Sequence, residues 1–148
     1  MTPTLFGRWQ TRVLLLWTIG LIITLVYMYV FGLFQLDRHE PRFWVLIAIL
    51  GYVTIVGFAW DILYNYLQSF RWDRDWPLAY HFVAGIIEGL LIYVLFRFSL
   101  LPGVQYQDGD TIRFLLDYGT VWFVTYWWVF GPMRVLAPRW RFNGGELI

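Results

Sequence analysis

The chain has 148 residues, of which 59% are hydrophobic, 22% are aromatic and only 14% are charged. A soluble domain carries about 25% charged residues, so the excess of apolar side chains predicts a surface that faces lipid. The net charge of +1 gives no strong field for nucleic acid, and we expect no nucleic-acid partner. The absence of cysteine excludes disulfides, thiolate metal ligands and thiol catalysis.

Four apolar segments are each long enough to cross a hydrocarbon core about 30 Å thick. The connections between them are mostly short and polar, which makes neighbouring helices antiparallel. The sequence therefore predicts an all-α fold, in which residues 1–148 form one integral membrane bundle of four transmembrane helices with short loops. The expected helices cover about residues 13–34, 43–67, 77–98 and 112–133, and residues 134–148 form a tail.

The first expected helix contains no charged residue and follows Arg8 and Arg12. Its apolar run is longer than the about 7–15 residues of a signal peptide, so we interpret it as a retained membrane helix. Trp17 lies near one end of this helix, and Tyr27 and Tyr29 lie near the other. Aromatic side chains are typical of the two membrane interfaces, which supports this interpretation.

Polar residues of the second expected helix recur at spacings of three or four, which places them on one stripe. Such a stripe on a membrane helix normally faces the interior of the bundle. Its acid, Asp61, lies about 27 Å along the axis from the start of the helix, near the opposite interface. The stripe consists of Gly51, Thr54, Phe58, Asp61, Asn65 and Gln68.

The third expected helix carries Glu88 near its middle. At about 1.5 Å per residue, Glu88 lies roughly 16 Å from the start of the helix, near the bilayer midplane. A carboxylate at that depth costs on the order of 3 kcal/mol, so it needs a neighbour or a proton. Gly85 and Gly89 lie on the same face with Ala84 beside them, and this small-residue surface lets another helix approach closely.

Each of the other three helices places a threonine at a similar depth, namely Thr24, Thr54 and Thr125. If these threonines turn inward together, they form a buried polar layer with Glu88. No arginine is expected at this depth. We therefore expect Glu88 to be protonated and to donate a hydrogen bond to a threonine hydroxyl or a backbone carbonyl, because burial favours the neutral carboxyl group.

The acidic residues allow two interpretations. Asp117 near the outer face, Glu88 in the middle and Asp61 near the inner face would form a proton or cation path, with His81 two turns before Glu88. Alternatively, Glu88 and the threonines hold helices together or dock a partner helix, Asp61 and Asp117 are interfacial acids, and His81 bonds at headgroup level. We favour the second interpretation, since four short helices make a poor pore unless they oligomerise.

Enzyme motifs are absent from the sequence. Without lysine the chain has no Walker A motif and no Schiff-base chemistry, and neither serine lies in a G-x-S-x-G motif. No H-E-x-x-H motif and no Cys/His set with metal spacing occurs. We therefore expect a protein that is not an enzyme, with no metal site and no evident cofactor. A quinone, carotenoid or chlorophyll held between aromatic side chains is a further alternative.

The tail mixes arginine with aromatic residues, among them Arg134, Arg139, Trp140 and Arg141. We expect it either to contact anionic headgroups or a cytoplasmic partner, or to anchor the last helix. Arginine is more frequent in the N-terminal segment, the 71–76 turn and the tail than in the other two connections. The positive-inside rule therefore predicts that both termini are cytoplasmic, and the small size suggests a bacterial cytoplasmic membrane.

Three functions follow from these expectations. The first is a non-enzymatic assembly subunit in the lipid bilayer, packed into a homo-oligomer or against other membrane subunits through Gly85, Gly89 and the polar layer. The second is a proton- or ion-conducting oligomer that uses Glu88. The third is a membrane subunit that binds a lipophilic cofactor or a pigment.

Overall fold

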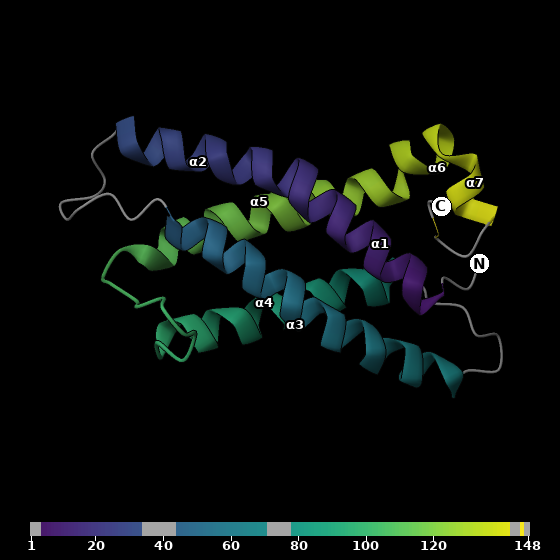
Figure 1. Ribbon diagram of the computed structural model, residues 1–148, viewed down its shortest axis with the longest axis horizontal. Helices are drawn as coiled ribbons and strands as arrows, with labels where there is room; N and C mark the ends of the chain where they lie inside the picture. The colour runs from purple at the N-terminus through teal and green to yellow at the C-terminus, as the bar shows by residue number, and fades with distance from the viewer. Residues whose placement is uncertain (1–3, 34–43, 71–77, 143–145, 147–148) are drawn as a thin grey trace.

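The computed structural model describes residues 4–33, 44–70, 78–142 and 146, and every regular element in these ranges is helical (Figure 1). The prediction of an all-α fold is confirmed for this part of the chain. The connections at 34–43 and 71–77 lie outside the described residues. The helices are α1 (Leu5–Leu15), the π-helical turn η1 (Leu16–Gly20), α2 (Leu21–Leu33), α3 (Trp44–Ser69), α4 (Leu78–Arg97), α5 (Asp110–Phe130), α6 (Pro132–Leu136) and α7 (Pro138–Phe142).

The first helix begins earlier than the sequence predicted. It starts at Leu5 instead of residue 13 and runs from α1 through η1 into α2. Thr4 caps its N-terminus, because the Thr4 Oγ1 atom accepts a hydrogen bond of 3.0 Å from the backbone N–H of Gly7. The helix therefore includes Arg12, which was expected to precede the membrane span.

The π-helical turn η1 widens the middle of this first helix. Single π turns inside α-helices are frequent at functional sites. Gly20, at the end of η1, faces the side chains of Val121 in α5 and Leu50 in α3, and a β-carbon at this position would press on Val121. The turn therefore lies in the middle of the bundle, in contact with both α3 and α5.

Three helices in the described ranges are long and apolar enough to cross a membrane, which is compatible with an integral membrane protein. The helix α5 has a comparable length of 21 residues. Asp110, Arg113 and Asp117 make it less apolar than the other three. The three apolar helices are Leu5–Phe31, Trp44–Ser69 and Ala79–Arg97.

The long helices form one bundle in which α1 packs against α3, α2 against α3 and α5, and α4 against α3 and α5 (Figure 1). The short helices α6 and α7 turn back toward α1. Trp140 Nε1 donates a hydrogen bond of 2.8 Å to Thr11 Oγ1, and Thr4 Oγ1 donates one of 2.8 Å to Glu146 Oε1. The start of the first helix and the C-terminal segment therefore meet at the same end of the bundle.

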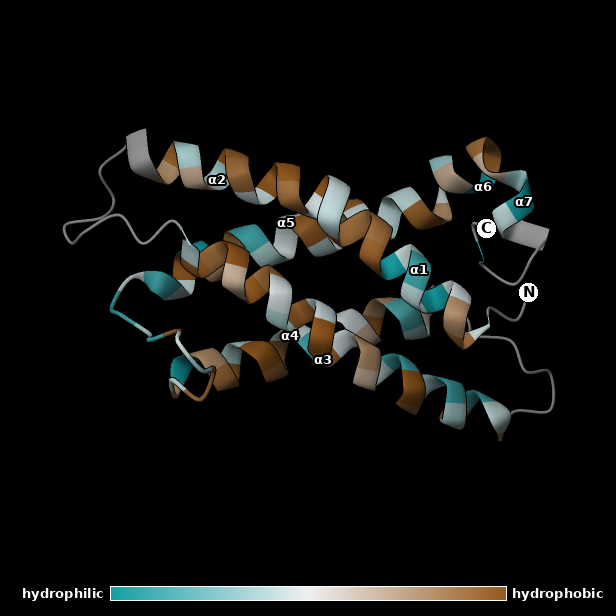
Figure 2. Cartoon of the chain, in the orientation of Figure 1, coloured by the Kyte–Doolittle hydropathy of each residue, from teal (hydrophilic) through white to brown (hydrophobic). Residues whose placement is uncertain are grey.

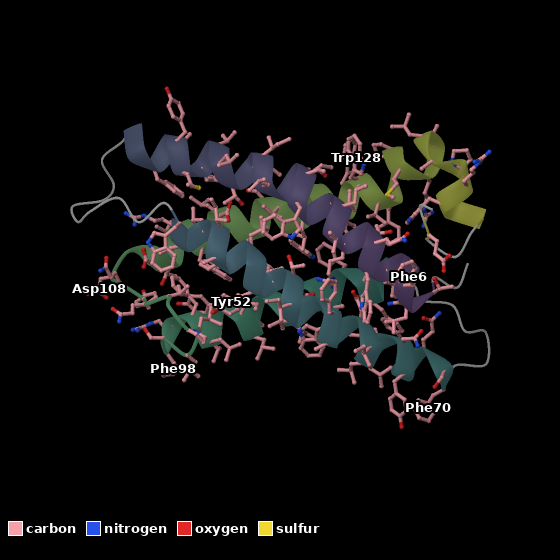
Figure 3. The ribbon with its side chains drawn as sticks, in the orientation of Figure 1. Phe6, Tyr52, Phe70, Phe98, Asp108 and Trp128 are labelled. Atoms are coloured by element: carbon pink, nitrogen blue, oxygen red, sulfur yellow. The ribbon has the colours of Figure 1, made fainter. Side chains whose placement is uncertain are left out.

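Hydrophobic side chains lie both in the core and on the outside of the bundle. Figure 2 shows that α2 is mostly hydrophobic, whereas hydrophilic residues gather in α1 and α7. Ile92 and Phe96 of α4 are fully buried in the core. Phe70 and Phe98 are exposed and point away from the bundle (Figure 3). An outer surface of this kind suits contact with lipid tails.

Two glycines of α4 let α5 approach closely. Gly85 faces the indole of Trp122 and Gly89 faces the ring of Tyr118, so a β-carbon at either position would overlap the ring. The Tyr118 hydroxyl donates a hydrogen bond of 2.7 Å to the backbone oxygen of Gly85. Ala84 beside them is buried. The small-residue surface, which was expected to dock another subunit, is therefore covered by a helix of the same chain.

Substituting Gly89→Ala should lower the free energy of unfolding by about 1–3 kcal/mol, because the ring of Tyr118 must move to admit the methyl group. The matched control is Gly119→Ala in α5, where a β-carbon meets no atom within 4 Å. This control should be neutral or slightly stabilising, since alanine favours helix over glycine. Both free energies are measured by denaturant unfolding in detergent with circular dichroism. Equal effects at the two positions would contradict the packing of α4 against α5.

Candidate functional site

The side chain of Arg12 joins three helices through two carboxylates. From α1, its Nε donates a hydrogen bond of 2.9 Å to Asp61 Oδ2 in α3, and its Nη2 donates one of 3.1 Å to Asp61 Oδ1. Its Nη1 donates a hydrogen bond of 2.8 Å to Glu88 Oε1 in α4, and Nη2 reaches Glu88 Oε2 at 3.3 Å. The planar guanidinium therefore binds both carboxylates in a bidentate manner, which is the strong form of this interaction.

This network corrects the expectation that Glu88 has no cationic partner. The expectation was wrong because the first helix begins at Leu5, so that Arg12 lies inside the bundle. The side chains of Arg12, Asp61 and Glu88 are only 18%, 8% and 6% exposed. Water screens such a buried ion pair little, so its geometry matters more than that of a surface pair.

Gly57 makes room for the guanidinium group. It lies one helical turn before Asp61 in α3, and a β-carbon at this position would overlap Arg12. One guanidinium balances only one of the two carboxylates that it contacts. The network of Arg12, Asp61 and Glu88 therefore keeps an excess of one negative charge when all three groups are ionised.

The threonines do not form one layer with Glu88. The hydroxyl of Thr54 donates to the backbone oxygen of Leu50 in its own helix at 2.9 Å. That of Thr125 donates to the backbone oxygen of Val121, also in its own helix, at 2.7 Å. Hydroxyl groups in membrane helices can satisfy themselves in this way without a partner helix. The expected hydrogen bond from Glu88 to a threonine is therefore replaced by its ion pair with Arg12.

Thr24 instead connects α2 to α5 through a side-chain hydrogen bond. Its hydroxyl donates a hydrogen bond of 3.3 Å to Asp117 Oδ2, and its side chain is fully buried. Asp117 is only 4% exposed. Its second oxygen, Oδ1, is buried and has no hydrogen-bond partner among the described residues. Asp117 is therefore a further buried acid, outside the network of Arg12, Asp61 and Glu88.

A cavity of about 590 Å³ lies between the long helices and reaches both acidic groups. Arg12, Asp61, Glu88 and Asp117 all line it. Four aromatic side chains of α5, spaced four residues apart, form part of the wall, namely Tyr118, Trp122, Tyr126 and Phe130.

His81 also lines the cavity, together with Ala84. Its ring meets the ring of Phe130 edge to face, with centroids 5.3 Å apart. The structure therefore places His81, Asp61, Glu88 and Asp117 around one cavity. Asp61 and Glu88 share the single guanidinium of Arg12. The proton-path interpretation required these two acids to lie at well-separated depths, so this part of it is not met.

The C-terminal segment covers one end of the cavity. Trp140 lines it, as does Arg134, whose guanidinium lies over the ring of Phe130 at 5.0 Å. Arg8 lies at the same end and donates a hydrogen bond of 2.5 Å to Gln68 Oε1. Trp140 thus points toward α1 instead of serving only as a lipid contact.

Of the other two tail arginines, the structure describes the side chain of Arg139 only. Arg139 is exposed, which leaves it available for the lipid or partner contact that the sequence suggested. The side chain of Arg141 lies outside the described residues.

The residues that sequence reasoning missed are Arg12 and Gly57. The sequence held a signal that the first helix begins before Arg12, because Thr4 is a good N-cap residue. In the structure, Gly7, Thr11 and Leu15, which recur every four residues, form the buried side of α1. Comparison with protein family models, with curated proteins and with solved structures finds no match to this chain. The geometry of the cavity is therefore the basis for the function proposed below.

Replacing Arg12→Met should lower the free energy of unfolding by about 3–5 kcal/mol, because Asp61 and Glu88 then lose the cation that they share. Methionine keeps much of the length and apolar stem of the side chain, so the loss reports mainly the charge. The control Arg139→Met removes an exposed arginine and should stay within about 0.5 kcal/mol. Chemical unfolding in detergent measures both variants. A loss at Arg12 no larger than at Arg139 would contradict the network.

Proposed function

We propose that this chain is an integral membrane protein that binds a small lipophilic molecule inside its helix bundle. The observation that carries this proposal is the cavity of about 590 Å³. Ligand sites commonly enclose about 300–1,000 Å³ and combine apolar walls with a few polar groups. Here aromatic side chains of α5 supply the apolar wall, and Arg12, Glu88 and Asp117 supply polar groups. This is the third of the functions expected from the sequence.

The proposal includes a fourth membrane span formed by α5. Its 21 residues extend about 31 Å, which matches the hydrocarbon thickness. Its acid Asp117 is buried inside the bundle, whereas Leu115, Phe123 and Trp127 are exposed on the outside. An even number of spans also agrees with the meeting of both chain ends at one end of the bundle. The arginine distribution supports a cytoplasmic location for this end, and the small size of the chain suggests a bacterial cytoplasmic membrane.

Assembly with other subunits ranks below ligand binding. This function depended on the surface of Gly85 and Gly89 as a docking face for a neighbour. Trp122 and Tyr118 of the same chain occupy that surface. Glu88, the centre of the expected polar layer, is likewise engaged by Arg12 within the chain. The features that pointed to an assembly subunit therefore serve the internal packing of this bundle.

Proton or ion conduction is a second candidate, because Asp61, His81, Glu88 and Asp117 line the same cavity. Asp61 and Glu88 are both held by the guanidinium of Arg12, so these two acids are not free to pass a proton or a cation along the cavity. We therefore rank conduction after binding. Proton flux into vesicles that contain the purified chain tests this alternative, and flux no greater than in empty vesicles would exclude it.

The binding proposal predicts cavity-dependent uptake of at least one of three compounds of similar shape and different charge. The compounds are tetraphenylphosphonium, tetraphenylborate and neutral triphenylphosphine oxide. Equilibrium dialysis against micelles without protein corrects for partition into detergent. We expect Val129→Trp to reduce uptake by about tenfold or more, because Val129 lines the cavity and the indole fills it. Val83→Trp, on the exposed side of α4, should have little effect.

Thr125→Leu is a second cavity-filling variant for the case in which Val129→Trp does not fold. The Thr125 hydroxyl bonds only to backbone oxygens of its own helix, so its loss breaks no contact between helices. Uptake of none of the three compounds above the micelle background would refute the proposed binding function. Uptake that persists in both cavity-filling variants would place the compounds outside the cavity and refute it equally.

A further inference from the structure

We propose that the cavity selects a lipophilic organic cation, such as a protonated or quaternary amine that carries apolar groups. The positive charge would lie near Asp117, with the apolar groups against the aromatic wall of α5. This inference rests on the proposed binding function and specifies the chemical class of the ligand. Three observations on different parts of the cavity support it.

The first observation is the balance of charge. Asp61, Glu88 and Asp117 all line the cavity, and Arg12 is the cation in contact with the first two. The three guanidinium nitrogens of Arg12 all donate to these carboxylates, which leaves Arg12 poorly disposed to bind an anionic ligand. Apart from Arg8 and Arg134, the charged residues of the lining are therefore three acids and one arginine.

The other two arginines of the cavity lie at one end of it. Arg8 donates to Gln68 near the end of α3, and Arg134 covers the ring of Phe130 at the end of α5. Asp117 lies in the first half of α5, opposite Thr24 of α2. Within the described residues, no arginine forms an ion pair with Asp117.

The second observation is the unsatisfied oxygen of Asp117. This residue is 4% exposed and lines the cavity, and its Oδ1 atom has no hydrogen-bond partner among the described residues. A buried carboxylate oxygen without a donor or a cation is unfavourable, because burial removes its hydration. A cationic group in the cavity would supply the missing interaction.

The third observation is the aromatic wall. Tyr118 is the next residue after Asp117, and Trp122, Tyr126 and Phe130 follow at intervals of four residues on the same side of α5. Aromatic faces attract organic cations through the ring quadrupole, and tryptophan does so best. An acid beside a row of aromatic rings therefore suits a cation that is itself apolar, better than a hydrated metal ion or an anion.

Two of the compounds named above test this inference most directly, because tetraphenylphosphonium and tetraphenylborate share shape and differ in the sign of their charge. The wild-type chain should bind tetraphenylphosphonium at least about tenfold more tightly than tetraphenylborate, since burying unlike charges together favours only the cation. This comparison needs no substitution, so it does not depend on the folding of a variant. Equal or tighter binding of the borate would overturn the inference. The proposed binding function would survive that result, whereas failure of all three compounds would remove both.

Asp117→Asn should then weaken binding of tetraphenylphosphonium by about tenfold or more, and by much more than it weakens binding of neutral triphenylphosphine oxide. Asparagine keeps the size of the side chain and an oxygen that can accept from Thr24. The matched control is Asp110→Asn on the same helix, where Asp110 bonds to Gln107 and Arg113 outside the cavity. Equal loss of cation binding in both variants, or none in Asp117→Asn, would show that Asp117 does not select the cation.

Discussion

The guanidinium of Arg12 between Asp61 and Glu88 is the interaction on which the rest of the bundle depends. It connects α1 to α3 and α4 inside the bundle, where each buried charge alone would be costly. An ion pair in such a place is retained only when its geometry is good, and four hydrogen bonds from one side chain meet this condition. Gly57 is needed for the same network, because any side chain at this position would displace the guanidinium of Arg12.

The fourth long helix is held in a different way. Aromatic rings of α5 pack onto the glycines of α4, and Thr24 of α2 reaches Asp117. The ion network connects three helices and the aromatic contacts hold the fourth. A cavity lined by aromatic rings and a few charged groups lies between these helices. Residues of the ion network and aromatic residues of α5 both line this cavity. This combination of acids and aromatic rings is the basis of the proposal that the cavity binds an apolar cation.

The sequence was sufficient for the all-α fold and for the expectation that Glu88 needs a partner or a proton, because apolar runs and an isolated acid are local signals. It was not sufficient for the partner of Glu88. An arginine just before an apolar run is normally interfacial, so Arg12 was left outside, although Thr4 offered an N-cap upstream of it. The cover of Gly85 by Trp122 also depends on which helix packs there, and spacing along one helix does not specify the neighbour.

The most direct test of this account is the distance between Arg12 and Glu88 in a lipid bilayer. Solid-state NMR on protein with ¹⁵N-labelled arginine and ¹³C-labelled glutamate detects a guanidinium nitrogen close to a carboxyl carbon. The account predicts such a correlation, as required by the 2.8 Å between Arg12 Nη1 and Glu88 Oε1, and its loss in Arg12→Lys. No correlation in the wild-type chain, or one that persists in Arg12→Lys, would contradict it.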